Sequence, residues 1–225
     1  MQSAAVLFDM DGVIFDSERA IYSLVLELAE EEGVTGIPEV YPQLIGITRE
    51  KSIKILTDFY GPDFPYARYR EILTERYHSR YDHGRLPLKP YVHEILSDLS
   101  RLGFRLAVAS STPTPVVVRQ IEEAGLARYF SSVIGGDQVR RSKPEPDIFL
   151  FAAGSVGAAP EACYVIEDSF NGIRSAAAAG MTPVMVPDML EPDGEIRSLA
   201  AAVLPDLGAA DRWIAGDARR RLLIP

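Results

Sequence analysis

Two aspartates stand two residues apart in the segment Asp9-Met10-Asp11-Gly12, and a second acidic pair, Glu167-Asp168, occurs far along the chain. Each pair follows a short apolar run. Two carboxylates about 4 Å apart repel by roughly 4 kcal/mol at an effective dielectric constant of about 20, so a cluster of them favours a bound cation. All-oxygen ligation suits Mg²⁺, which keeps several waters and accepts a phosphate oxygen as a further ligand. The acidic pairs therefore predict a magnesium site that could take a phosphorylated substrate.

Hydroxyl groups and one lysine complete a set of groups that could hold a phosphate. Ser110, Ser111 and Thr112 end another apolar run, and Pro113 after them is acceptable in the first turn of a helix. Free backbone N–H groups at a helix start attract anions. Ser110 and Lys143 would face the phosphate oxygens that a metal leaves unneutralised, and Ser111 would add its backbone N–H. The alternative for Ser111 and Thr112 is that they only cap the helix.

Asp9 and Asp11 suit the two roles that phosphoryl transfer requires. Asp9, beside the metal, can attack phosphorus and form an aspartyl-phosphate. Asp11 can protonate the leaving oxygen and then deprotonate the incoming water. An isolated Asp-x-Asp-Gly segment is more often a turn in which the glycine supplies a positive φ. The coincidence with the other groups favours the catalytic interpretation.

The apolar runs that precede these groups must be the elements that position them. They are rich in β-branched residues and most lack polar alternation, which indicates strands buried on both faces of a parallel sheet. The runs cover residues 4–8, 105–109, 133–134, 163–166, 184–186 and, weakly, 202–204. Helical spacing between the later runs predicts an α/β fold with a Rossmann-like parallel sheet. Ligands of such sheets bind outside the carboxyl ends of the strands, where the candidate residues fall.

A helical insert interrupts this alternation directly after the first strand. Apolar spacings predict helices over about 18–32, 49–60 and 66–81, with no convincing strand between them. We therefore expect a core domain of residues 1–15 and 88–225 and an inserted all-helical domain of residues 16–87.

The overall composition excludes several classes of partner. The formal net charge is −9, whereas nucleic-acid binding draws its affinity from positive charge that neutralises phosphates. No apolar run approaches the ~20 residues of a membrane span, and the N-terminus lacks the basic region of a signal peptide. Cys163 is the single cysteine, and its apolar surroundings place it in the core. We expect a cytoplasmic enzyme with neither a nucleic-acid nor a membrane partner.

Four segments together resemble the motifs of the haloacid dehalogenase superfamily of aspartate-nucleophile phosphotransferases. They are Asp9-x-Asp11-Gly12-Val13, residues 106–110, Lys143-Pro144, and Glu167-Asp168 with Asn171-Gly172 following. The order and spacing agree over essentially the whole chain. The helical insert is similar to the cap of the subgroup that contains β-phosphoglucomutase and small sugar-phosphate phosphatases.

The resemblance implies roles for individual residues. It makes Asp9 the nucleophile, Asp11 the acid/base, Ser110 and Lys143 the phosphate-binding groups, and Asp9, Asp168 and the carbonyl of Asp11 the Mg²⁺ ligands. Glu167 matches a position that is sometimes a ligand and sometimes lies behind the ligands. Dehalogenases lack an aspartate at the position of Asp11, because halide leaves without a proton, so phosphoryl transfer is favoured.

Phosphatase and mutase are the two activities that this resemblance leaves open. Residues 46–50 resemble the β-phosphoglucomutase segment whose arginine, here Arg49, holds a second phosphate. The histidine that gates hydrolysis in the mutase corresponds to Ile21. We therefore favour a phosphatase acting on a small phosphorylated metabolite, in particular a sugar phosphate, with a mutase as the alternative. Arg49 could instead be an exposed helix charge, and Glu18 either a substrate contact or a first-turn acid.

Two alternative functions, from classes other than phosphotransferases, are less well supported by the sequence. A signalling receiver domain also combines acidic residues, a hydroxyl and a lysine around Mg²⁺, but its phospho-acceptor follows a later strand and it lacks a helical insert. A non-catalytic sugar-phosphate sensor would have lost Asp9 or Asp11, and both are present. For the assembly we expect a monomer, with a homodimer as the alternative.

Overall fold

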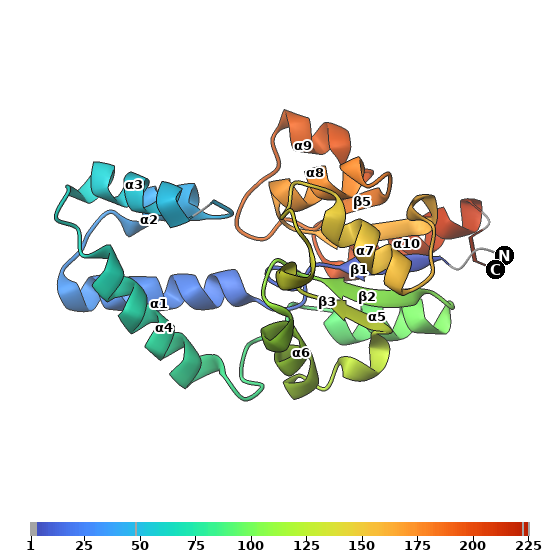
Figure 1. Ribbon diagram of the computed structural model, residues 1–225, viewed down its shortest axis with the longest axis horizontal. Coiled ribbons are helices and arrows are strands. Elements are labelled where there is room, and N and C mark those ends of the chain that lie inside the picture. Colours follow the sequence, from blue (N-terminus) through green and yellow to red (C-terminus); the bar gives the residue numbers. More distant parts are fainter. Residues whose placement is uncertain (1–3, 48, 222, 225) are drawn as a thin grey trace. The chain divides into compact units, whose positions relative to one another are not determined.

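A computed structural model describes residues 4–47, 49–221 and 223–224, and the chain divides into two compact units (Figure 1). The first, called here the α/β unit, contains the chain up to Asp16 and from Leu88 onward. The second, called the helical unit, spans Ser17–Pro87. The four segments with candidate catalytic groups all belong to the α/β unit.

The α/β unit is built on a parallel sheet with the strand order β3-β2-β1-β4-β5-β6. The strands are β1 (Ala5–Phe8), β2 (Arg105–Ala109), β3 (Ser132–Ile134), β4 (Cys163–Glu167), β5 (Thr182–Met185) and β6 (Ala202–Val203). These are the six strands predicted from the apolar runs, and each observed bound lies within two residues of the predicted one. Because β1 pairs with both β2 and β4, the strand order reverses beside β1, and a ligand crevice is expected at the carboxyl ends there.

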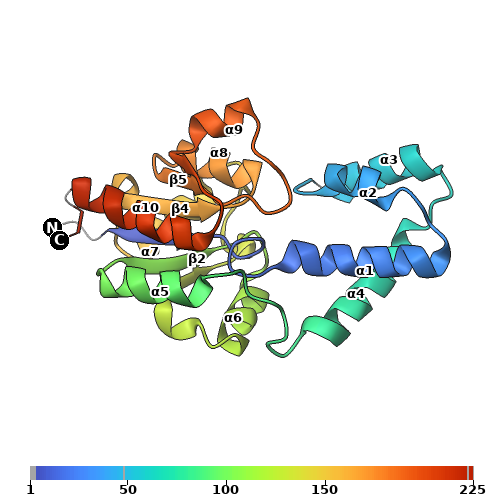
Figure 2. The ribbon, with the colours of Figure 1, turned by 180° about the vertical axis from the view of Figure 1, so that it is seen from behind.

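Helices cover both faces of this sheet, which explains why the strands are apolar without alternation. The helices of the unit are α5 (Val92–Arg101), α6 (Thr114–Glu123), α7 (Asp147–Ser155), α8 (Phe170–Ala178), α9 (Gly194–Leu199) and α10 (Leu207–Arg220), with 3₁₀ turns η2 (Ala127–Tyr129), η3 (Gly136–Gln138) and η4 (Pro160–Ala162). Cys163 and Leu7 pack with α7 and α8 on one face. On the other face lie α5 and α10, where the Tyr164 hydroxyl donates to Asp217 at 2.8 Å (Figure 2). The prediction that Cys163 belongs to the core is confirmed.

The chain leaves the α/β unit and re-enters it at neighbouring points. Phe15 pairs with Leu88 in an antiparallel bridge, and the backbone N–H of Lys89 donates to the carbonyl of Ile14 at 2.9 Å. The Lys89 ammonium also donates to Asp16 Oδ1 at 3.3 Å. The last residues before the helical insert and the first residues after it are therefore tied to each other within the α/β unit.

The helical unit consists of two groups of elements (Figure 1). They are α1 (Ser17–Glu32) with α4 (Tyr66–Tyr81), and α2 (Ile37–Val40) and η1 (Tyr41–Leu44) with α3 (Arg49–Tyr60). The three helices predicted from apolar spacing are confirmed, with a one-residue difference at Ser17. The sequence did not predict α2 and η1, because each has only four residues, too few for a helical period. No helix among the described residues is long and apolar enough to cross a membrane.

Candidate active site

Lys143 connects the ends of three central strands. Its ammonium group donates to Asp9 Oδ1 after β1 at 2.5 Å, to Glu167 Oε1 at the end of β4 at 2.7 Å, and to the carbonyl of Ala109 on β2 at 3.1 Å. The side chains of Lys143, Asp9 and Glu167 are 6%, 10% and 0% exposed. Burial opposes the charge of Lys143, but Asp9 and Glu167 outweigh burial and raise its pKa above the usual value. Lys143 is therefore a permanent cation at the centre of this cluster.

Asp9 lies in an environment that penalises its negative charge. Burial, together with the charges of Glu167 and Asp11, raises the pKa of Asp9 to about 8 against the opposing effect of Lys143. One lysine thus balances only part of the negative charge gathered here. A further positive charge beside Asp9 would favour its ionised form, which is the form that can act as a nucleophile.

Three carboxylates lie close enough to share a metal ion. Asp9, Glu167 and Asp168 each offer an oxygen, and these oxygens all lie within 4.8 Å of one another. Such hard oxygen donors fit Mg²⁺ or another hard divalent cation. Both oxygens of Glu167 also have protein partners: Lys143 binds Oε1, and Oε2 accepts the backbone N–H groups of Asp168 and Ser169, at 3.1 and 3.0 Å, and the Ser169 hydroxyl at 2.9 Å.

Two glycines permit the acidic side chains to approach the backbone. A Cβ at Gly172 would lie 1.8 Å from the carboxyl carbon of Glu167, and a Cβ at Gly12 would lie 2.2 Å from Asp168 Oδ2. Gly12 also has a φ of +76°, which other residues rarely adopt. Any side chain at either position would displace a carboxylate of the cluster.

Thr112 holds the side chain of Asp11. Its hydroxyl donates to Asp11 Oδ2 at 3.0 Å, and its backbone N–H donates to the hydroxyl of Ser110 at 3.1 Å. Ser110 is 1% exposed, so its hydroxyl is fixed inside the strand-end cluster. The end of β2 therefore orients the predicted acid/base residue of β1. Sequence reasoning missed this role for Thr112, although a third hydroxyl in a row after a strand was a usable signal.

The alternative that Ser111 or Thr112 caps the following helix is wrong. Helix α6 has Pro113 at its N-cap position, without a side-chain cap. The backbone N–H of Thr114 instead donates to Asp137 Oδ1 at 2.7 Å. Ser111 is exposed immediately after the end of β2, beside the buried Ser110.

The two remaining candidates, Arg49 and Glu18, belong to the helical unit. Arg49 is the first residue of α3 and is exposed, and Glu18 is half-buried in the first turn of α1. Residue 48, within the segment that resembles the mutase, lies outside the described residues. The structure thus gathers Asp9, Asp11, Ser110, Lys143, Glu167 and Asp168 in one unit and describes Arg49 and Glu18 in the other.

Most of the chain matches a known protein family. Residues 6–186 match the family described as haloacid dehalogenase-like hydrolase. The chain belongs to this family. The resemblance predicted from the four segments is confirmed, as is the prediction of an enzyme of the hydrolase type. The matched region contains every catalytic candidate discussed above, and it also contains the helical insert.

Relatives of this hydrolase include proteins with named phosphatase activities. A phosphorylated carbohydrates phosphatase of Thermotoga maritima is 29% identical over 177 residues, which is 79% of this chain and 82% of the relative. A phosphoglycolate phosphatase of Shigella boydii is 33% identical over 199 residues, covering 80% of this chain and 79% of the relative.

Solved structures resemble this hydrolase over nearly its whole length. A haloacid dehalogenase family hydrolase from Deinococcus radiodurans, with bound phosphate and sodium, is 28% identical with a TM-score of 0.80, and the match covers 99% of this chain and 98% of that chain. A Thermotoga maritima protein assigned as a β-phosphoglucomutase is 27% identical with a TM-score of 0.72, over 89% and 94% of the two chains. The predicted fold class is confirmed.

Proposed function

We propose that this hydrolase is a magnesium-dependent phosphatase that hydrolyses a small phosphorylated metabolite through an aspartyl-phosphate. The observation that carries the proposal is the bonding of Lys143 to both Asp9 and Glu167, which joins a buried carboxylate, a cation and an acidic cluster at one edge of the sheet. The phosphatase names of two relatives support the reaction, and the name of one of them supports a phosphorylated carbohydrate as the substrate class.

In the first step, Asp9 would displace the leaving group from phosphorus. Lys143 binds Asp9 Oδ1, so we assign the attack to Oδ2. A bond forms between Oδ2 and phosphorus while the bond from phosphorus to the ester oxygen breaks. Asp11 donates a proton to the departing oxygen. Since Thr112 donates to Asp11 Oδ2, the transferable proton must reside on Asp11 Oδ1.

In the second step, water would hydrolyse the phospho-aspartate. The carboxylate of Asp11 takes a proton from the water, whose oxygen attacks phosphorus and releases the carboxylate of Asp9. Ser110 and Lys143 would hold the phosphoryl oxygens in both steps, with the backbone N–H of Ser111 beside them. After phosphate departs, Asp11 carries the proton again and both aspartates are ready for another turnover.

The residues that would hold Mg²⁺ are Asp9, Asp168 and the carbonyl of Asp11. A bound divalent cation would supply positive charge to the phosphoryl oxygens and to the acidic cluster. Glu167, whose two oxygens already have protein partners, would position Lys143 and the turn after β4. Arg49 and Glu18 are proposed contacts for the rest of the substrate. We further propose that the enzyme is a cytoplasmic monomer, with a homodimer as the alternative.

A mutase remains the second candidate, because the Thermotoga maritima structure assigned as a β-phosphoglucomutase matches this chain. The two are separated by incubating the enzyme with β-glucose 1-phosphate and a catalytic amount of the 1,6-bisphosphate. We expect no glucose 6-phosphate, because Ile21 cannot gate hydrolysis as a histidine could. Rapid conversion would establish the mutase instead.

The phosphatase proposal is tested by the release of phosphate from an aryl phosphate and from a panel of sugar phosphates and phosphoglycolate. We expect turnover that EDTA removes and Mg²⁺ restores. Asp9→Asn should abolish turnover while the circular dichroism spectrum stays unchanged. Phosphate release that survives in Asp9→Asn would show that another group is the nucleophile.

A further inference from the structure

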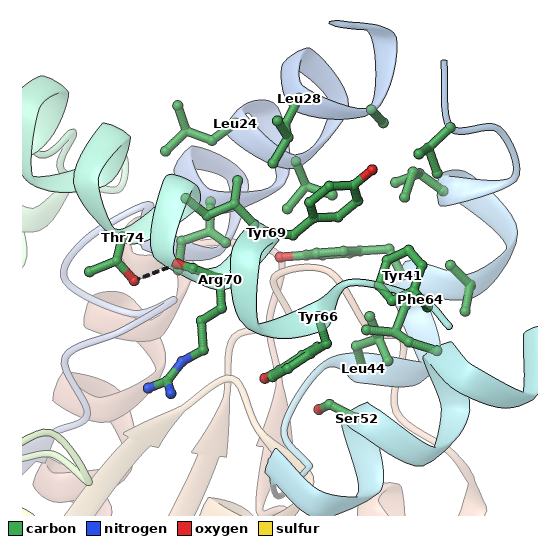
Figure 3. Close-up of a pocket in the computed structure, with 18 of the residues that line it drawn as sticks. Leu24, Leu28, Tyr41, Leu44, Ser52, Phe64, Tyr66, Tyr69, Arg70 and Thr74 are labelled. Carbon is green, nitrogen blue, oxygen red and sulfur yellow. Dashed lines mark hydrogen bonds between the residues drawn. The ribbon is translucent and has the colours of Figure 1, made fainter. Parts of the chain in front are cut away.

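The helical unit contains a cavity of about 420 Å³ among its helices (Figure 3). Its walls are largely apolar, with Leu24 and Leu28 from α1, Tyr41 from η1, Leu56 from α3 and Tyr69 from α4 among the lining residues. This volume lies within the range of about 300–1,000 Å³ that is usual for small-molecule sites, which are likewise lined mainly by apolar and aromatic side chains.

Helix α4 leaves its apolar side chains partly exposed along the cavity, whereas Leu24 and Leu28 of α1 are buried. None of the residues of α4 is buried, although Tyr69, Leu73 and Tyr77 follow helical spacing and all line the cavity. On α3 only Leu56 is buried. Protein interiors are normally packed without such space, and apolar surface left in contact with water costs about 25 cal/mol per Å². An apolar molecule in the cavity would therefore cover the apolar surface that Tyr69, Leu73 and Tyr77 of α4 leave partly exposed.

Three ion pairs hold α4 against α1 beside this cavity. Each joins an arginine of α4 to a glutamate of α1 by two hydrogen bonds, at 2.7 and 2.9 Å for Arg68–Glu32, 2.5 and 2.9 Å for Arg76–Glu31, and 2.6 and 2.8 Å for Arg80–Glu27. These pairs fix the two helices that form one wall of the cavity. They account for three of the four arginines of α4.

Arg70 is the fourth arginine of α4, and it lines the cavity. Within the described residues its guanidinium group has neither an ion pair nor a hydrogen bond to another side chain. Figure 3 shows this group and the hydroxyl of Tyr66 at the same edge of the cavity, on the side away from Leu24 and Leu28. The cavity therefore combines an apolar interior with a cation and a hydrogen-bond donor at one edge.

We propose that this cavity binds a small organic anion with an apolar body, namely a carboxylate with a chain of about eight carbons. The carboxylate accepts hydrogen bonds from Arg70 and Tyr66, and the chain lies among the leucine and tyrosine side chains. An unpaired guanidinium at the edge of an apolar cavity matches both parts of such a ligand, because guanidinium binds carboxylate through paired hydrogen bonds. Binding of the carboxylate is measured without turnover, so its test does not depend on the phosphatase activity proposed above, although Ile21 also lines the cavity.

The probe for the test is sodium octanoate, titrated calorimetrically into the full-length protein at constant ionic strength. We expect saturable binding of one octanoate per chain. Arg70→Met should weaken binding about tenfold through loss of the charged hydrogen bonds. Ala29→Leu adds three carbons to the wall of the cavity and should weaken binding without lowering the midpoint of thermal unfolding. Neutral 1-octanol should bind more weakly than octanoate.

A matched control is Arg68→Met, which removes the same charge from the same helix at a residue that does not line the cavity, while Arg76–Glu31 and Arg80–Glu27 still hold α4 against α1. It should bind octanoate as the wild type does. The proposal fails if octanoate does not saturate one site, if Arg70→Met and Arg68→Met bind equally, or if Ala29→Leu binds octanoate as tightly as the wild type.

Discussion

The role of Lys143 in stability can be tested by Lys143→Met, which keeps much of the length of the side chain and removes its charge. In the wild type the ammonium lies 2.5 Å from Asp9 and 2.7 Å from Glu167. Removing one partner of a buried ion pair typically costs about 3–5 kcal/mol, because the remaining charge is buried without compensation. For a chain of this size, that loss lowers the midpoint of thermal unfolding by roughly 6–20 °C.

The pH dependence of this variant distinguishes an electrostatic effect from a packing defect. With Lys143 absent, burial and the neighbouring carboxylates hold the pKa of Asp9 above its value in the unfolded chain. The folded variant then binds more protons than the unfolded chain, so its stability increases as the pH falls. We expect the difference from wild type to be smaller at pH 5 than at pH 8.

The assay is thermal unfolding followed by circular dichroism in EDTA, at both pH values, with Lys54→Met as the matched control. Lys54 pairs with Asp58 at 2.6 Å, but the two side chains are 75% and 65% exposed, so its substitution should cost less than about 1 kcal/mol. The reasoning is refuted if both variants lose similar stability, or if the deficit of Lys143→Met is the same at both pH values.

Three further predictions concern the same site. Thr112→Val should lower kcat about 10- to 100-fold with little change in KM, because the acid/base loses a hydrogen bond to a charged group, whereas Thr112→Ser should retain most activity. The pKa of Asp9 rises from 3.8 in the unfolded chain to about 8 in the fold, so without a cation the contribution of Asp9 to stability declines as the pH rises through this range. Since Mg²⁺ binds the ionised form of Asp9, Mg²⁺ should raise the midpoint of thermal unfolding more at pH 8 than at pH 6. Gly172→Ala should destabilise the fold by roughly 3 kcal/mol or more, because the new Cβ displaces Glu167 from its bonds, whereas Gly154→Ala on α7, with nothing within 4 Å of its Cβ, should be neutral or stabilising in urea denaturation.

The strands and the long helices could be predicted because each has a local pattern. A strand buried on both faces must be apolar, and β1 is apolar throughout, as is β4 up to Ile166. Helices α1, α3 and α4 each span at least three turns, so apolar spacing is visible. In contrast, α2 and η1 have only four residues each, and the sequence shows no periodicity over so short a segment.

The candidate site could be predicted as a set of residues but not as a set of contacts. Asp9, Lys143 and Glu167 were identifiable because they follow strands whose ends meet in a parallel sheet. The hydrogen bond from Thr112 to Asp11 depends on the register between β1 and β2 in the sheet. These two strands are far apart in the sequence, and no local pattern sets their register. The cavity of the helical unit depends on how four helices fail to fill the space between them, and no local pattern reports that.

The pairing of Phe15 with Leu88 has a consequence for the evolution of the chain. Since the polypeptide departs and returns at adjacent points, folding of the α/β unit treats Ser17–Pro87 as one long loop. The entropy of closing a loop grows only with the logarithm of its length, by about 0.6 kcal/mol for each doubling. The inserted segment can therefore be lengthened, shortened or exchanged between lineages while the strand that carries Asp9 keeps its place in the sheet.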